Sequence, residues 1–183
     1  MDKIPTIFER DWDGNRGVID QVVADVSGAR VMATEKLDGT NVRLTIRNRT
    51  VVRAEKRRNP SKIEKQKGVI NPWYVDATDG DPQDKWIYDG IKNTDLAAID
   101  DGEYSGELVG PNIQGNPLNL ETNRIVLFKF GIMVFDSVPK QYDELKEWLK
   151  NAKSLYGNDC GIEGIVWWMD GKPIGKIKLK DFK

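Results

Sequence analysis

The sequence predicts an α+β domain built on antiparallel β-sheet. Three observations predict it: several short segments alternate apolar and polar residues, turn dipeptides separate them, and few stretches have helical periodicity. The 183 residues, of which 39% are hydrophobic and 31% charged, suit one soluble domain over residues 1–183. No apolar run approaches the about 20 residues that a membrane helix needs, so no membrane partner is expected.

Residues 31–56 are expected to form three strands joined by two tight turns. The segments VMATEKL and NVRLTIR each alternate in polarity, and Asp38–Gly39 between them is typical of a β-hairpin. A second turn is expected at Asn48–Arg49, before the segment TVVRAEK. Because side chains alternate along a strand, Lys36 and Glu35 should point to opposite faces.

The middle of the chain predicts loops and buried strands. Residues 62–101 are rich in Asp, Pro and Gly and should form loops with one or two helices, the best candidate beginning after Pro82. Residues 103–110 and 125–136 are expected to be buried strands.

The end of the chain predicts one helix followed by a hairpin. The segments 161–169 and 173–180, separated by Asp-Gly-Lys, should form that hairpin. Residues 142–153 have the clearest helical pattern, an apolar stripe at i, i+3, i+4 and i+7. The stripe consists of Leu145, Trp148, Leu149 and Ala152.

Charge is distributed unevenly, although the net charge is only −1. Residues 43–67 hold ten Lys/Arg and two Glu, residues 76–107 hold ten Asp/Glu and two Lys, and residues 172–183 hold five Lys and one Asp. Runs of like charge are often no more than solvated surface. The alternative is that the basic segments bind a polyanion.

The absence of histidine and the presence of only one cysteine restrict the catalytic groups that this chain can use. The chain has no histidine, which excludes histidine metal ligands and Ser-His or Cys-His catalytic pairs. The one cysteine, Cys160, cannot form an internal disulfide and is interpreted as a structural thiol. Residues 1–10 lack the apolar stretch of a secretory signal, so a cytoplasmic location is expected. Catalysis would depend on Lys, Asp, Glu or Tyr.

Lys176, Lys178 and Lys180 recur at every second position of the last predicted strand and should share one face. Three cations on one face repel one another unless an anion lies there. The row is either a charged edge that prevents sheet-to-sheet aggregation or a phosphate-binding surface.

Lys36 and two glutamates are the other candidates for chemistry. Lys36 is either a solvated strand residue or a nucleophile, whose amine would be deprotonated more readily by partial desolvation and nearby cations. Glu107 and Glu163 lie beside glycines on predicted buried strands, where a carboxylate needs a partner. Each is either a structural ion pair or part of a metal–nucleotide site.

The order of these motifs resembles that of the covalent nucleotidyltransferase superfamily, which contains ATP-dependent polynucleotide ligases and mRNA capping enzymes. Six short motifs between residues 34 and 182 match in order. The resemblance implies that Lys36 in EKLDGTN forms a lysyl-AMP, with Glu35 beside it in the nucleotide site. It implies these further roles: Arg57 or Arg58 (EKRRNP) in the basic motif, Glu107 (GELVGP) on the ribose, Phe135 (IMVFDS) stacking on the adenine, Glu163 (IEGIV) near the metal, and Lys178 and Lys180 (KIKLKDF) on the phosphate.

Asn41 narrows the resemblance to one branch. DNA ligases of the superfamily generally have arginine at the position of Asn41, whereas KLDGTN, GELVGP and IKLKDF are similar to RNA ligases. The start of the chain, KIPTIFERDWDGN, resembles the N-termini of small stand-alone RNA ligases. By that resemblance Asn41, Arg57 and Arg58 would bind the RNA end. The basic segment 43–67 would bind the RNA backbone.

The resemblance also implies a fold, cofactors and partners. The fold is an antiparallel-sheet-rich nucleotidyltransferase (adenylyltransferase) domain of the ATP-grasp-like ligase type, without an OB-fold, since the chain ends after the last lysine motif. The cofactors are ATP and Mg²⁺ or Mn²⁺, and the substrate is RNA with 5′-phosphate and 3′-hydroxyl ends, joined in RNA repair. No obligate protein partner is expected, and a phage-encoded protein would act in the host cytoplasm. The alternatives are a catalytically reduced nucleotide- or RNA-binding module, a DNA ligase and a guanylyltransferase.

Overall fold

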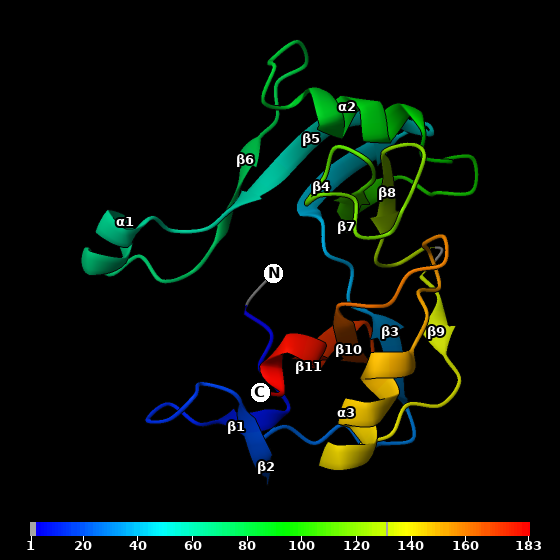
Figure 1. The fold of residues 1–183 in the computed structure, drawn as a ribbon. Helices are drawn as coiled ribbons and strands as arrows, with labels where there is room; N and C mark the ends of the chain where they lie inside the picture. The colour runs from blue at the N-terminus through cyan, green and yellow to red at the C-terminus, as the bar shows by residue number, and fades with distance from the viewer. Residues whose placement is uncertain (1–2, 131) are drawn as a thin grey trace. The chain divides into compact units, whose positions relative to one another are not determined.

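The computed structural model describes residues 3–130 and 132–183, which divide into two compact units (Figure 1). Unit 1 comprises Lys3 and Asp38–Ile132, and unit 2 comprises Ile4–Leu37 and Met133–Lys183. Each unit has its own sheet and its own hydrophobic core. The single domain expected over residues 1–183 stays a prediction.

Unit 1 is built on a five-stranded antiparallel sheet with the strand order β6-β5-β4-β7-β8. Helix α2 (Lys85–Lys92) packs against β7 and β8, and the short helix α1 (Lys62–Gln66) lies between β5 and β6. Figure 1 shows α1 standing away from this sheet. The strands are β4 (Thr40–Arg47), β5 (Thr50–Arg58), β6 (Trp73–Asp76), β7 (Gly102–Val109) and β8 (Arg124–Leu127).

The sheet of unit 1 has an apolar face and a polar face. Val42, Leu44 and Ile46 of β4 are completely buried and pack with Ile87 of α2 in the core. The residues between them in β4 point to the opposite face, which is the polar one.

Unit 2 is built on a four-stranded antiparallel sheet with the strand order β11-β10-β3-β9. Helix α3 (Tyr142–Asn151) covers one face, where Leu145 and Leu149 pack against Ile165 and Trp167 as the predicted stripe requires. A 3₁₀ turn, η1 (Leu179–Asp181), follows β11. The strands are β3 (Val31–Glu35), β9 (Val134–Phe135), β10 (Gly164–Met169) and β11 (Lys172–Lys178), with β1 (Phe8–Arg10) and β2 (Val18–Val22) in a separate pair.

The predicted fold class is confirmed at the level of an antiparallel-sheet-rich fold with few helices. Helix α2 begins after Pro82, and α3 covers most of residues 142–153. The turns at Asn48–Arg49 and Asp170–Gly171 have positive φ at both residues, as type I′ hairpins require. No helix in the described part of the chain is long and apolar enough to cross a membrane.

The hairpin predicted at Asp38–Gly39 is wrong. Strand β3 pairs with β9 and β10, whereas β4 pairs with β5 and β7. The chain leaves one sheet at Glu35 and enters the other at Thr40, so Asp38–Gly39 lies in a connection between the units. Alternation of polarity predicted both strands but carried no information about which strands they pair with.

Two other strand predictions are also wrong. Residues 125–136 are not one strand, because β8 ends at Leu127 in unit 1 and β9 begins at Val134 in unit 2. Strand β11 ends at Lys178, and Lys180 lies in turn η1. The three lysines therefore do not form a row on one strand face.

Candidate functional site

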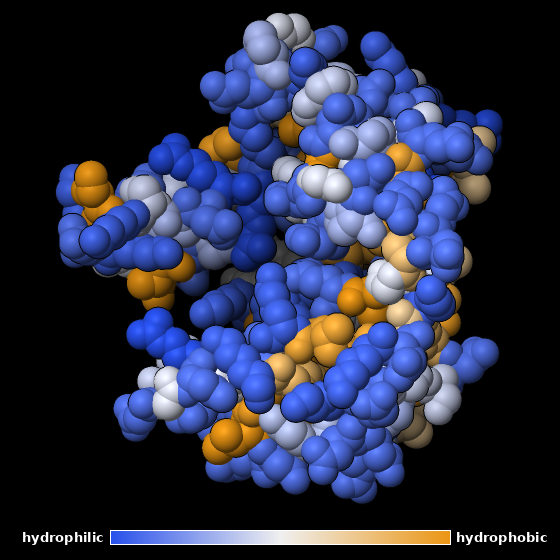
Figure 2. All heavy atoms as spheres, viewed as in Figure 1, coloured by the Kyte–Doolittle hydropathy of each residue, from blue (hydrophilic) through white to orange (hydrophobic). Residues whose placement is uncertain are grey.

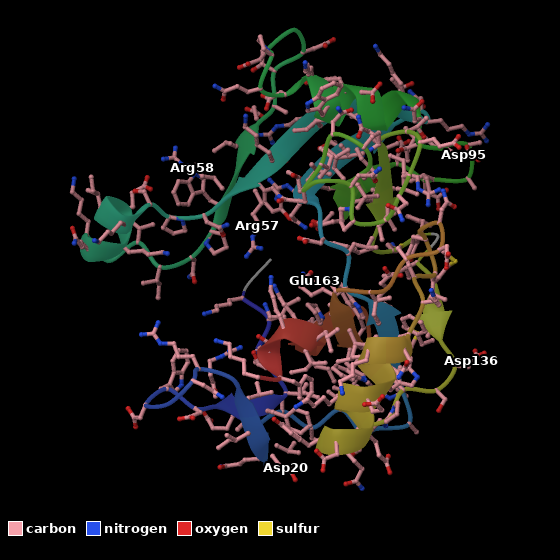
Figure 3. The ribbon with its side chains drawn as sticks, in the orientation of Figure 1. Asp20, Arg57, Arg58, Asp95, Asp136 and Glu163 are labelled. Carbon is pink, nitrogen blue, oxygen red and sulfur yellow. The ribbon has the colours of Figure 1, made fainter. Side chains whose placement is uncertain are left out.

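Three lysines surround one carboxylate in unit 2, and we call this group the lysine cluster. The Nζ atom of Lys36 lies 2.5 Å from Oε2 of Glu163, the carboxylate labelled in Figure 3, and Nζ of Lys178 lies 2.8 Å from Oε1. The Nζ atom of Lys180 lies 3.7 Å from the same Oε1, and its side chain is mostly exposed. Three cations against one carboxylate leave an excess of positive charge that an anionic ligand would neutralise.

Backbone pairing sets the geometry of the lysine cluster. The N–H of Lys36 donates to the carbonyl of Gly164 at 2.8 Å, which extends the β3–β10 pairing by one residue. The N–H of Leu179 donates to the carbonyl of Glu163 at 3.0 Å, and Gly164 is paired with Lys178. Three motifs that are distant in sequence therefore meet at one end of this sheet.

Gly164 allows β10 and β11 to approach each other beside Glu163. A Cβ atom at Gly164 would lie 2.0 Å from the carbonyl oxygen of Ile177 and 2.8 Å from Cα of Lys178. Both distances are far shorter than any real contact of a Cβ atom. The glycine that follows Glu163 is therefore required by backbone packing.

The neighbouring lysines keep Glu163 ionised. Burial by itself would raise the pKa of Glu163. The hydrogen bonds from Lys178 and Lys36, together with their charges, outweigh burial and hold the pKa of Glu163 below its ordinary value of 4.5.

The ion pairs of Glu163 should make stability depend on pH. A carboxyl group with a lowered folded-state pKa contributes stability that is complete above its unfolded pKa and is lost as the pH falls through its folded pKa. We therefore expect Glu163→Gln to lower the free energy of unfolding at neutral pH, and the difference from wild type to narrow in acid. Denaturant titrations between about pH 7 and pH 3, without divalent cations, measure this. A difference that does not vary with pH would contradict it.

Asp181 orients the end of β11 and was not singled out from the sequence. Its Oδ2 accepts a hydrogen bond from the N–H of Lys178 at 3.0 Å, and its Oδ1 pairs with Arg10 at 2.8 Å. These contacts hold the turn that takes Lys180 off the strand. The only available signal was a single acid inside a run of lysines.

Glu35 points away from the lysine cluster, as strand alternation predicts. It is paired with Ile165 and only 5% exposed. Its carboxylate accepts hydrogen bonds from the hydroxyl of Ser154 at 2.8 Å and from the N–H of Leu155 at 2.8 Å. Burial raises the pKa of Glu35, and these hydrogen bonds oppose the rise only in part. Glu35 anchors the chain after α3, and its role in nucleotide binding stays a prediction.

Phe135 lies on the α3 face of the unit 2 sheet. It is paired with Ala33, and its ring meets the ring of Trp148 edge to face, with centroids 5.2 Å apart. A groove of about 430 Å³ at this edge is lined by Phe135, Ala33 and Trp167 among other residues. Lys36 does not line this groove.

The register of β9 therefore separates Phe135 from the lysine cluster. Thr34 and Lys36 are two residues apart and so share a face, and the β9 residue paired with Thr34 is Val134. In this register Phe135 and Lys36 lie on opposite faces of the sheet. Strand β8 ends at Leu127 and β9 begins at Val134, so the alternation of one continuous strand does not apply, and stacking of Phe135 on the adenine stays a prediction.

Asn41 and Glu107 are neighbours on the polar face of unit 1. They are directly opposite in β4 and β7, and Nδ2 of Asn41 donates to Oε2 of Glu107 and to the carbonyl of Gly106, both at 3.3 Å. The hydroxyl of Tyr74 donates to Oδ1 of Asn41 at 2.7 Å and lies 3.2 Å from Oγ of Ser105. Tyr74 therefore fixes the orientation of the Asn41 amide. No sequence pattern distinguishes Tyr74 from the other aromatic residues of the strands.

Arg57 and Arg58 lie on opposite faces of β5 (Figure 3). Arg57 is paired with Tyr74, on the face that carries Asn41, and its buried Nε has no hydrogen-bond partner among residues 3–130 and 132–183. Arg58 instead pairs with Glu64 of α1 at 3.3 Å. Of the two predicted arginines, the structure brings Arg57 to Asn41 and leaves Arg58 on the other face.

Gly39 is needed for close approach between strands and not for a hairpin. A Cβ atom at Gly39 would lie 2.2 Å from the carbonyl oxygen of Leu108 and 2.8 Å from Cγ of Glu107. The glycine of EKLDGTN therefore lets the start of β4 lie against β7, beside Glu107.

A divalent cation fits the lysine cluster only together with a phosphate ligand. No group of three acidic or sulfur ligands that could hold a metal occurs in the described part of the chain. Mg²⁺ is commonly held by one or two carboxylates plus substrate phosphates and waters. Glu163 is one such carboxylate, and both of its oxygens are engaged by lysines. A metal at Glu163 would have to arrive with a nucleotide.

No protein-family model matches the chain, and no curated protein matches it. Among solved structures, the chain is similar to a Naegleria gruberi RNA ligase mutant in its apo form, with 18% identity and a TM-score of 0.39, over 82% of this chain and 49% of the other. It is also similar to a Naegleria gruberi RNA ligase mutant with AMP and Mn, with 17% identity and a TM-score of 0.37, over 81% and 48%. The chain spans about half the length of these ligase structures.

Seven of the predicted site residues thus fall into two groups, whereas Glu35, Arg58 and Phe135 belong to neither. Unit 2 holds the lysine cluster, which combines an amine, a carboxylate and two further cations. Unit 1 holds a polar group formed by Asn41, Glu107 and Arg57. Tyr74 of β6 is paired with Arg57 and donates a hydrogen bond to Asn41. The first group suits nucleophilic attack on a phosphate, and the second offers donors to an anionic end.

Proposed function

We propose that the chain is an ATP-dependent RNA ligase that acts through a lysyl-AMP at Lys36. The observation that carries this proposal is the lysine cluster, where Lys36, Glu163 and Lys178 meet although they come from three separate motifs. A lysine that is simply exposed to solvent on a strand needs no such partners. AMP and Mn are present in one of the similar ligase structures, and for this chain we propose ATP with Mg²⁺ or Mn²⁺.

In the first step the amine of Lys36 attacks the α-phosphorus of ATP. A P–N bond forms while the P–O bond to pyrophosphate breaks, so that AMP remains on the lysine and pyrophosphate leaves. The lysine must lose a proton before it attacks, and Oε2 of Glu163, at 2.5 Å, is an acceptor within reach. Lys178 and Lys180 would balance the negative charge that develops on the phosphate. A bound divalent cation would neutralise the triphosphate and favour departure of pyrophosphate.

In the later steps AMP passes to the 5′-phosphate of an RNA end, which frees Lys36. The 3′-hydroxyl of the other end then attacks this phosphate, and AMP leaves as the phosphodiester forms. Asn41 and Arg57 would bind the RNA end, for which the partner-free Nε of Arg57 supplies a donor in the described structure. Glu107 would accept a hydrogen bond from the ribose of the nucleotide. The reaction would take place in the cytoplasm.

Labelling with nucleotide tests the proposal. After incubation with Mg²⁺ and α-labelled ATP, we expect an acid-labile covalent label that is transferred to RNA with a 5′-phosphate, followed by sealing to a 3′-hydroxyl end. Absence of label from ATP would overturn the proposal.

The same assay distinguishes the alternatives. Nucleotide binding without covalent label would indicate a catalytically reduced binding module. Label from GTP alone would favour a guanylyltransferase, and transfer only to DNA ends would favour a DNA ligase.

A further inference from the structure

The basic segment 43–67 contains two kinds of cation. Three of those within the sheet of unit 1 are already paired with carboxylates, two of which are buried, and so are poorly available to a ligand. These pairs are Arg43 with Glu55, Arg53 with Asp76, and Lys56 with Asp84.

The second kind of cation lies on the arm, by which we mean residues 59–72 between β5 and β6. Lys62, Lys65 and Lys67 are exposed, and α1 buries no residue at all. The carboxylate of the arm, Glu64, pairs with Arg58, and no ion pair of the three lysines occurs within the described residues. Figure 2 shows a hydrophilic surface over the arm that is interrupted by apolar side chains, since Ile63, Val69 and Ile70 are also exposed. The arm therefore presents three unneutralised ammonium groups to solvent.

Local contacts, and not a core, hold the arm in shape. A helix of five residues that buries nothing gains no stability from tertiary packing. Its first turn is closed by a capping box, in which Glu64 N–H donates to Ser61 Oγ at 3.2 Å and Ser61 N–H donates to Glu64 Oε2 at 2.7 Å. At the base of the arm, the guanidinium of Arg58 lies 5.2 Å from the ring centroid of Trp73. These contacts order a segment whose main feature is its lysines.

The chemistry of the arm suits the backbone of a nucleic acid. Exposed ammonium groups bind phosphates as point charges, without reading sequence. Single-strand binders add aromatic side chains on which bases stack, and residues 59–72 contain no aromatic residue. A double-stranded RNA conceals its bases and is recognised through its backbone and shape. The arm therefore matches a duplex better than a single strand.

We propose that the arm is a docking surface for the sugar–phosphate backbone of double-stranded RNA. Lys62 and Lys65 are three residues apart on α1, close enough to reach one backbone together, and Lys67 follows at the end of the helix. The identity of the polymer as RNA rests on the proposed function, whereas the backbone contact rests on the arm itself. The arm shares no residue with the lysine cluster and takes no part in the chemical steps.

The salt dependence of RNA binding tests this proposal. The variant Lys62→Ala/Lys65→Ala/Lys67→Ala is compared with wild type for binding of a nicked RNA duplex, from about 50 to 200 mM salt. Each lost phosphate contact should reduce the slope of log affinity against log salt by about 0.9, so that three contacts reduce it by about 2.7. A matched control, Lys146→Ala/Lys150→Ala/Lys153→Ala, removes three cations from and beside α3 and should leave the slope unchanged.

The outcomes separate this proposal from the proposed function. An unchanged slope in the arm variant, or an equal loss in the α3 control, would overturn the docking surface. Equal loss for single-stranded RNA, or loss for a DNA duplex alone, would overturn the assignment to double-stranded RNA. Covalent labelling by ATP should be the same in the arm variant and wild type. If wild type takes no label while the arm variant loses duplex binding, the ligase fails and the docking surface stands.

Discussion

Replacing Glu163 with alanine should reduce the rate of covalent nucleotide transfer to Lys36 by about 100-fold or more, since small misplacements of reacting groups cost that much. Glu163 is the carboxylate that holds both Lys36 and Lys178. Without it, the remaining ammonium groups repel one another and the Lys36 amine is no longer fixed. Single-turnover labelling with α-labelled ATP measures the rate.

Two further variants test whether the loss of rate comes from the charge of Glu163 and not from the loss of any ion pair. Glu163→Gln keeps the shape and one acceptor but removes the charge, so its rate should fall between wild type and Glu163→Ala. Glu147→Gln breaks an exposed ion pair with Lys150 on α3 and should label at the wild-type rate. A wild-type rate in Glu163→Ala would show that the lysine cluster is structural only.

Gly164→Ala should destabilise unit 2 by about 3 kcal/mol, the upper range for inserting a methyl group into a packed interior. The added Cβ would lie 2.0 Å from the carbonyl oxygen of Ile177, and backbone cannot move aside as a flexible side chain can. For a chain of this size the loss corresponds to roughly 6–12 °C in Tm. Thermal unfolding followed by circular dichroism measures it.

Gly161→Ala provides the matched control for Gly164→Ala. It lies three residues earlier, and a Cβ there would have the carbonyl oxygen of Ala152 as its nearest neighbour, at 3.8 Å, an ordinary contact. Its Tm should change little. Equal Tm values for the two variants would mean that β10 and β11 do not approach each other as closely as described.

Strand alternation predicted much of the fold but not the pairing of strands. It placed Glu35 opposite Lys36, and the turn residues at Asn48–Arg49 and Asp170–Gly171 marked two hairpins correctly. It could not show that β3 and β4, adjacent in sequence, belong to different sheets. Partner choice depends on contacts between distant segments, about which a local pattern is silent.

The candidate site was predicted from the order of motifs more than from periodicity. That order led to Lys36, Glu163 and Lys178, which the structure brings together. The choice between Arg57 and Arg58 could not be made from sequence, because one residue of register reverses the face of every side chain. The same sensitivity applies to Phe135: its strand β9 does not continue β8, so the sequence could not show which face of the sheet its ring occupies.

Mapping the nucleotide adduct tests the central claim most directly. Wild-type protein is incubated with ATP and Mg²⁺, digested near neutral pH to preserve a P–N bond, and analysed by mass spectrometry. We expect AMP on the peptide that contains Lys36, no AMP adduct in Lys36→Ala, and an unchanged adduct in Lys140→Ala, which replaces a lysine outside the lysine cluster. AMP on another residue, equal labelling of Lys36→Ala, or no adduct in wild type would contradict the assignment of Lys36 as the nucleophile.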